Sequence, residues 1–285
     1  MTLIDTHAHL DSSDFKEDAE EVIRRALDNN VWMILVGADY KSSNRSLNLA
    51  NKYQKGVYAA VGLHPNNIAR PETADESGAS LVQENYRLEN FDYGSYEKLA
   101  SFEKVVAIGE IGLDYYHLNP KEDVRAIKEK QQAVFVEQLL LARSLDLPVI
   151  IHCRQAHDDL VGILEEFKKE YSEIIPPDRP WGVMHCFSGD EDLAWRYFNL
   201  GLLISFTGLI TFSQQWDELI RKVPLDKIMI ETDTPFMTPE PYRGKRNEPL
   251  LVQYVAQRIA EIKNLRIERI AEATLANAKK LFKLN

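Results

Sequence analysis

Short apolar runs alternate with amphipathic segments along most of this chain, and this alternation predicts its secondary structure. Apolar runs bounded by polar or glycine-containing turns are typical of buried strands. We predict strands at Leu3–Asp5, Trp32–Val36, Val57–Gly62, Val105–Gly109, Pro148–His152, Gly182–His185, Leu202–Ser205 and Ile228–Thr232. Between them, apolar residues recur at helical spacing, as they do in Ala133–Leu141. We predict helices at Ala19–Leu27, Arg45–Tyr53, Lys121–Leu145, Leu160–Phe167, Leu193–Leu200, Trp216–Val223, Leu250–Lys263 and Ile267–Phe282.

The order of these elements predicts the fold class. Strands that alternate regularly with helices favour an α/β fold with a parallel sheet. Eight such units that close on themselves form the (β/α)8 TIM barrel, whose usual length agrees with the 285 residues of this chain. A doubly wound open sheet is the alternative. The first strand is followed by no glycine-rich phosphate loop, which weakens the dinucleotide-binding form of that alternative.

One segment, Asn66–Phe102, interrupts the regular alternation. It is long, polar and rich in Pro, Gly, Ser, Asp and Glu, so we expect an excursion from a barrel loop between the third and fourth strands. Short helices are predicted near Leu81–Leu88 and Tyr96–Phe102. A lid or partner-binding surface is one interpretation of this excursion, and a tolerated surface insertion is the other.

Composition and charge limit the function classes. Residues 1–285 are expected to form a single domain, and 45% hydrophobic residues suffice for a large core. The net charge of −10 argues against a broad non-specific nucleic-acid surface, but permits a small site whose positive charge comes from bound metal. With two cysteines, no secretory signal and no stretch long enough to cross a bilayer, we expect a cytoplasmic protein without membrane contact.

Histidines and acids gather at the predicted strand ends. In "LIDTHAHLD", His7 and His9 follow the first strand one residue apart, so both face one side. The other groups at strand ends are His64 after the third strand, Glu110 after the fourth, His152 and His185 at the ends of the fifth and sixth, and Asp233 after the eighth. The remaining histidines, His117 and His157, lie away from these ends. Because the carboxyl ends of barrel strands share one rim, the pattern predicts a metal site there.

The number of candidate ligands suggests two divalent ions. His7, His9 and Asp233 are expected to hold one ion, because the first and eighth strands are neighbours in a closed barrel. His152 and His185, which lie on adjacent strands, are expected to hold a second ion. Glu110 lies between the two groups and is expected to bridge both ions, about 3.5–4 Å apart, the arrangement that hydrolyses phosphate esters and amides.

The motifs that carry these residues resemble the TatD family of metal-dependent deoxyribonucleases. The matching stretches, in the family's order, are "DTHAHLD", "GLHP", "GEIGLDYY", "IHCRQA", "HCFSG", "ISFTGLITF" and "ETDTPFMTPEPYRGKRNEP". The resemblance implies a barrel of the amidohydrolase-like superfamily and Mg-supported cleavage of DNA, often from the 3′ end. It also implies ligand roles for His7, His9, Glu110, His152, His185 and Asp233, and a substrate-side role for His64.

This chain departs from the family pattern at two places. The family often has a further histidine directly after "HP", and here that position is Asn66. The excursion Asn66–Phe102 is also longer than usual. Both departures lie beside the third strand, where they bear on substrate preference.

Several other residues have two interpretations. Arg154 and Arg243, the latter in "YRGKR" (242–246), suit a phosphate backbone, whereas pairing with a helix acid and a solvated loop are the alternatives. Cys153 and Cys186 are expected to face the helix layer as packed thiols. Tyr115 and Tyr116 suit either base stacking or packing at the rim.

Three functions agree with this pattern. The leading hypothesis is a phosphodiesterase that cleaves DNA at single-stranded or frayed ends, with Asp233, Glu110 and His64 as catalytic groups and Arg154 and Arg243 on the substrate. A small-molecule amidase, lactonase or deaminase on the same barrel is the second, and a non-catalytic scaffold the third. Glu110 favours the nuclease, because many binuclear relatives bridge their ions with a modified lysine at that place. Four imidazoles favour Zn or Mn, whereas the family resemblance favours Mg, and no obligate protein partner is evident.

Overall fold

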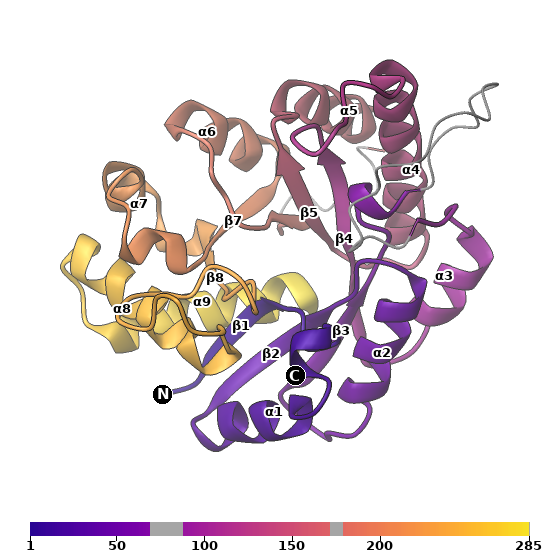
Figure 1. Ribbon diagram of the computed structural model, residues 1–285. Coiled ribbons are helices and arrows are strands. Elements are labelled where there is room, and N and C mark those ends of the chain that lie inside the picture. Colours follow the sequence, from indigo (N-terminus) through magenta and orange to yellow (C-terminus); the bar gives the residue numbers. More distant parts are fainter. Residues whose placement is uncertain (69–87, 172–178, 285) are drawn as a thin grey trace.

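Eight parallel strands form the centre of the molecule (Figure 1). The structure is a computed structural model that describes residues 1–68, 88–171 and 179–284. Each strand pairs with the next in chain order: β1 (Leu3–Ala8), β2 (Val31–Val36), β3 (Val57–Val61), β4 (Val105–Asp114), β5 (Val149–Arg154), β6 (Gly182–Met184), β7 (Leu202–Phe206) and β8 (Ile228–Ile230).

The sheet returns to its first strand and nearly closes. Ala8 forms a parallel bridge with Thr234, beyond the end of β8. The Asp233 amide donates a hydrogen bond to the His7 carbonyl, and the His9 amide donates one to the Thr234 carbonyl, each at 3.0 Å. The predicted barrel is therefore confirmed, and the open doubly wound sheet is wrong.

Helices surround the strands (Figure 1). They are α1 (Ala19–Asp28), α2 (Tyr40–Ala50), α3 (Tyr93–Ala100), α4 (Val124–Ser144), α5 (His157–Glu170), α6 (Glu191–Leu200), α7 (Asp217–Lys222), α8 (Val252–Lys263) and α9 (Ile267–Phe282). Among the helices described, none is long and apolar enough to cross a membrane.

Two hydrophobic cores follow from the alternation of side chains along the strands. Leu3 belongs to the outer core between strands and helices, whereas its neighbour Ile4 belongs to the inner core inside the barrel. The inner core also contains Leu281 and Phe282 at the end of α9. The carboxyl end of α9 thus fills the amino end of the barrel, and the carboxyl end of the strands is left for polar groups.

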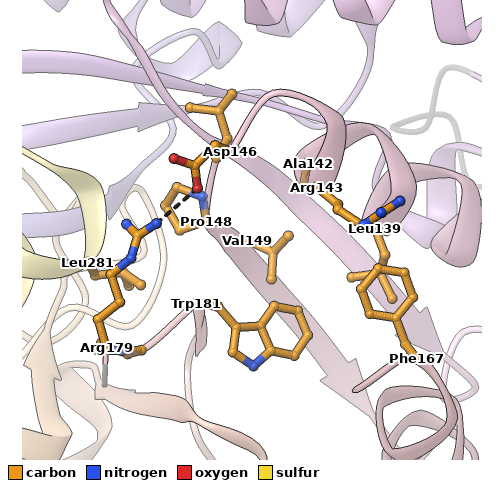
Figure 2. A pocket seen from close by; sticks show the side chains of 12 residues that line it. Leu139, Ala142, Arg143, Asp146, Pro148, Val149, Phe167, Arg179, Trp181 and Leu281 are labelled. Atoms are coloured by element: carbon orange, nitrogen blue, oxygen red, sulfur yellow. Dashed lines mark hydrogen bonds and ion pairs between the residues drawn. The ribbon is translucent and has the colours of Figure 1, made fainter. Parts of the chain in front are cut away.

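An apolar pocket also lies at the amino end of the barrel, near the starts of β5 and β6 (Figure 2). Val149, Phe167 and Trp181 contribute its apolar wall, and an ion pair between Arg179 and Asp146, 2.9 Å long, lies at its edge. This pocket is at the opposite end of the strands from the histidines.

The strand that carries Glu110 is longer than predicted. β4 continues to Asp114 rather than ending at Gly109, so Glu110 lies within it, where its register against β5 shifts. Gly112 has φ +139°, and a Cβ there would lie 2.0 Å from the His152 carbonyl oxygen. Gly109 and Gly112 allow the backbones of neighbouring strands to approach closely here. The sequence pattern had suggested a turn at this position, but the chain continues as a strand.

Four helices begin earlier than their apolar spacing predicted: α2, α3, α5 and α6. A capping box between Asp39 and Ser42 starts α2 at Tyr40. The helix expected at Tyr96–Phe102 is α3, whose start is capped by Asp92. The helix expected at Leu81–Leu88 falls almost entirely outside the described residues.

Candidate metal centre

Glu110 lies at the middle of the histidine cluster, and its two oxygens face different partners. Oε1 is 2.9 Å from Nδ1 of His152 and 3.4 Å from Nε2 of His185. Oε2 is 3.2 Å from Nε2 of His7 and 3.5 Å from Nε2 of His9. Each oxygen of this carboxylate therefore faces its own pair of imidazoles.

Asp233 and His64 complete the cluster on opposite sides of Glu110. Oδ1 of Asp233 is 3.7 Å from Nε2 of His9 and 4.0 Å from Nε2 of His7. Nε2 of His64 is 3.5 Å from Oε1 of Glu110. The structure thus brings together all seven of the residues singled out at the strand ends.

A buried aspartate fixes the junction of β1 with the chain beyond β8. Asp5 accepts hydrogen bonds from the backbone amides of His7 and Thr232, at 3.2 and 2.8 Å, and from the Thr232 hydroxyl at 2.5 Å. Burial raises the pKa of Asp5 to about 8, although the bonds from Thr232 oppose this shift. Asp5 therefore holds His7 and the segment carrying Asp233 in fixed relative positions.

Acceptors outside the cluster orient three of the rings. Nδ1 of His9 is 2.9 Å from the Val36 carbonyl, and Nδ1 of His185 is 2.7 Å from Oε1 of Glu231. Nε2 of His152 is 3.1 Å from Oδ2 of Asp114. When such a ring is neutral and its proton lies on the nitrogen that faces the outer acceptor, the other nitrogen presents a lone pair to the cluster.

His64 has the opposite arrangement. Its Nδ1 accepts a hydrogen bond from the Asn66 amide at 3.1 Å, so the neutral ring carries its proton on Nε2. Burial lowers the pKa of His64 to about 3, which keeps the ring neutral. An Nε2–H group that points into the cluster is a hydrogen-bond donor rather than a metal ligand.

The donor set of this cluster fits divalent cations. Burial alone would raise the pKa of Glu110. The neighbouring His185, His64 and His7 lower this pKa by more, so it lies well below its usual value and the carboxylate stays ionised. Burial lowers the pKa of His7 to about 4, and its ring stacks on that of His185 with centroids 3.6 Å apart. In the group His7, His9 and Asp233 the ligand atoms lie within 4.8 Å of one another. Imidazole and carboxylate groups, once deprotonated, are the ligands that a transition metal requires.

The sequence reasoning missed Asp114 and misplaced His117. Asp114 is fully buried, and its Oδ2 lies 2.8 Å from Nδ1 of His117 and 3.0 Å from Nδ2 of Asn66, besides His152. The statement that His117 lies away from a strand end is wrong, because β4 extends to Asp114. Asn66 therefore faces this carboxylate, at the position where the family often has histidine.

Glu231 was also missed, although a signal for it existed. It precedes Asp233 by two residues, so period-two alternation would have placed both on one side. It is buried, and its Oε1 accepts a hydrogen bond from the Cys186 amide at 2.7 Å.

The two cysteines differ from each other. Cys153 is a packed thiol, and burial raises its pKa to about 12. Cys186, in contrast, has its sulfur within 4.8 Å of ligand atoms of His185 and Asp233. The expectation that it faces the helix layer is wrong, because β6 ends at Met184 and the backbone at Cys186 turns to φ +45°.

Arginines and aromatic residues pair beside the cluster. The Arg154 guanidinium lies 3.9 Å from the centre of the Tyr116 ring, and that of Arg243 lies 3.8 Å from Phe212. Neither arginine forms an ion pair with an acidic residue of the described ranges. Tyr115, in contrast, is a packing residue whose hydroxyl donates to Asp159 at 2.8 Å.

The stretch "YRGKR" is only partly available to a ligand. Arg246 donates hydrogen bonds to Asp18 at 2.6 Å and to Glu248 at 3.2 Å. Its guanidinium thus links this loop to the start of α1, and Arg243 remains the arginine of the stretch that can face a substrate.

Comparisons with known proteins extend over the whole barrel. A family model described as TatD related DNase matches residues 4–283. The uncharacterized metal-dependent hydrolase YabD of Bacillus subtilis is 39% identical over 286 residues, covering 99% of this chain and 100% of that protein. The uncharacterized metal-dependent hydrolase YcfH of Escherichia coli K12 is 33% identical, covering 100% and 97%. The crystal structure of YjjV, a TatD homolog of Escherichia coli K12, matches with TM-score 0.79 and 32% identity over 99% of this chain and 98% of that one.

Proposed function

Since this chain belongs to the TatD family of metal-dependent hydrolases, in the amidohydrolase-like superfamily, we propose that it is a deoxyribonuclease that removes nucleotides from the 3′ ends of DNA. One observation carries the proposal: each oxygen of Glu110 faces its own pair of candidate ligand imidazoles. A carboxylate shared in this way suits a two-metal centre, which is the arrangement that many nucleases use. Residues 1–285 would act as one hydrolase domain.

Two sets of residues would hold the ions. His7, His9 and Asp233 would bind one with Oε2 of Glu110, and His152 and His185 would bind the other with Oε1. The ions, whether Mg, Mn or Zn, would polarise the phosphoryl group and make water more acidic. The imidazoles suit Mn or Zn better than Mg, which prefers oxygen ligands.

The chain's own residues would supply proton transfer and orientation. A carboxylate oxygen of Asp233 would accept the proton of the attacking water as its oxygen bonds to phosphorus and the ester P–O bond breaks. The leaving oxygen of the strand would take up a proton from solvent as it departs. The Nε2–H of His64 would donate to a phosphate oxygen and stabilise the charge that develops there. The buried walls around Glu110 would keep other water out.

Replacing His64 with alanine should lower the hydrolysis rate about a hundredfold, because a donor to the developing charge is lost. Metal content should stay near that of the wild type, since the Nε2–H tautomer presents no lone pair to an ion. Metal analysis and initial rates on the same preparations test this. Loss of a full metal equivalent would make His64 a ligand.

Replacing Asp114 with asparagine should weaken metal binding about 10- to 100-fold, because the acceptor that orients His152 is lost. A metal titration of the variant measures this. His117→Ala is the matched control, since it removes another partner of Asp114 but leaves the link to His152. Equal metal affinity in Asp114→Asn and the wild type would contradict the orienting role.

The experiment that tests the function compares substrates. The metal-loaded protein is offered DNA oligonucleotides with free or blocked 3′ ends, RNA of the same sequence, and a panel of amides and lactones. We expect cleavage of DNA with a free 3′ end. Turnover of an amide or lactone without DNA cleavage would instead establish the small-molecule hydrolase that the same barrel can support.

A further inference from the structure

We propose that Tyr116 and Phe236 form a stacking site for unpaired nucleobases on the two sides of the candidate metal centre. The inference rests on the proposed nuclease function and specifies how the strand would be held. Both rings are more than half exposed, at 53% and 60%, although each is attached closely to a residue of the cluster.

Phe236 is fixed through its backbone and not through its ring. Its amide donates a hydrogen bond to the Asp233 carbonyl at 2.9 Å, and its carbonyl accepts one from the side chain of Asn247 at 2.5 Å. Asn247 is itself fully buried and also donates to the Thr232 carbonyl. Because the backbone is fixed, the phenyl ring stays exposed to solvent and does not gain the favourable free energy of hydrophobic burial. A ligand that covers the ring would gain this free energy on binding.

Tyr116 is held by the carboxylate that also orients His152. Its amide donates to Oδ1 of Asp114 at 3.0 Å, while Oδ2 of the same group is 3.1 Å from Nε2 of His152. The guanidinium of Arg154 covers part of the ring. One aspartate therefore fixes the backbone of Tyr116 relative to a residue of the cluster.

Tyr116 and Phe236 are attached to opposite sides of the barrel. Tyr116 follows β4 and Phe236 follows β8, and these strands lie half a turn apart in the order of the sheet. Phe212, in the loop after β7, adds a third ring that is 39% exposed and lies under Arg243. Guanidinium groups beside aromatic rings present a cation for phosphate next to a face for a base, which is the combination that single-stranded nucleic acid requires.

An unpaired strand is the ligand that suits these rings. In a duplex both faces of each base are covered by its neighbours, whereas a frayed or single-stranded end exposes them. Every base has a flat face, so stacking holds any sequence, as a degrading exonuclease requires. The net charge of −10 would repel duplex elsewhere on the molecule and leave the mouth as the attractive region.

A double-mutant type of cycle tests the inference, in which the aromatic ring is removed from the protein and the base is removed from the oligonucleotide. The metal-loaded wild type, Phe236→Ala and Phe236→Trp are titrated with two non-cleavable single-stranded DNA oligonucleotides, one with all bases and one abasic at its 3′-terminal positions. The same is done for Tyr116→Ala. Phe102→Ala is the matched control, because Phe102 is 52% exposed but precedes β4 at the other end of the barrel.

Each ring-to-alanine change should weaken binding of the complete oligonucleotide about tenfold and leave binding of the abasic one unchanged. Phe236→Trp should bind as tightly as the wild type, and Phe102→Ala should change neither affinity. Equal losses on both oligonucleotides, no loss on either, or no binding by the wild type would overturn the inference. Base-selective binding without DNA cleavage would overturn only the proposed function, and cleavage without dependence on the bases would overturn only the stacking site.

Discussion

Replacing Glu110 with glutamine is expected to release both divalent ions and to lower the hydrolysis rate about a thousandfold or more, since two-metal chemistry would be lost. Glutamine keeps the shape of the side chain but removes its charge and turns one oxygen into a donor. That donor would face either the pair His152 and His185 or the pair His7 and His9. One pair of imidazoles would thus meet the amide donor, and the other pair would lose the negative charge that both oxygens share, so the substitution affects both groups.

Metal content per chain, measured after equal loading and dialysis, is the primary readout for Glu110→Gln. His152→Ala is the comparison, because its Nδ1 faces only Oε1 of Glu110 and should affect one ion. A thermal melt of each variant separates loss of metal from loss of fold. If both variants lost equal metal, or neither lost any, the bridging assignment would be wrong.

The barrel could be predicted because its signal is repeated and local. Each strand is a short apolar run, and parallel strands place their carboxyl ends on one rim. A histidine or acid at a strand end, such as His185 or Asp233, is therefore placed in space by counting alone. The seven residues at the predicted strand ends follow from that rule, although Glu110 lies within β4 and not after it.

The surroundings of the cluster could not be predicted in the same way. Asp114 lies on a continuation of β4, but the glycines around Glu110 led to the prediction of a turn there. The pairing of Arg154 with Tyr116 joins the end of β5 to the segment after β4, which are distant in the sequence. The basic stretch 242–246 suits a phosphate backbone by its sequence, but its Arg246 forms ion pairs with Asp18 and Glu248. Such contacts depend on tertiary geometry and produce no periodic pattern in the sequence.

The orientation of the rings is a further feature that only the structure supplies. The sequence treats His64 and His152 alike, since both lie at strand ends. Yet Nδ1 of His64 accepts a backbone amide, whereas Nε2 of His152 faces a carboxylate. The resulting tautomers present a proton in one case and a lone pair in the other, so similar positions acquire different chemistry.

Replacing Asp233 with asparagine should lower the rate about 10²- to 10⁴-fold at saturating metal, because the group that accepts the proton of water is lost. Asparagine is the informative substitution here. Asp233 has φ +56°, a left-handed conformation that asparagine adopts readily and alanine does not, so the backbone that holds the cluster should persist.

The second readout is metal affinity, which separates proton transfer from ligation. The amide oxygen of asparagine can remain near His7 and His9, so Asp233→Asn should lose less metal than Glu110→Gln. When the metal concentration is raised, Asp233→Asn should bind its ions again, but its hydrolysis rate should stay low. Asp11→Asn is the matched control, because Asp11 follows β1 at the same rim but pairs with Arg45 at 3.1 Å. Recovery of the full rate at high metal would show that Asp233 only binds an ion, and the proton would then need another acceptor.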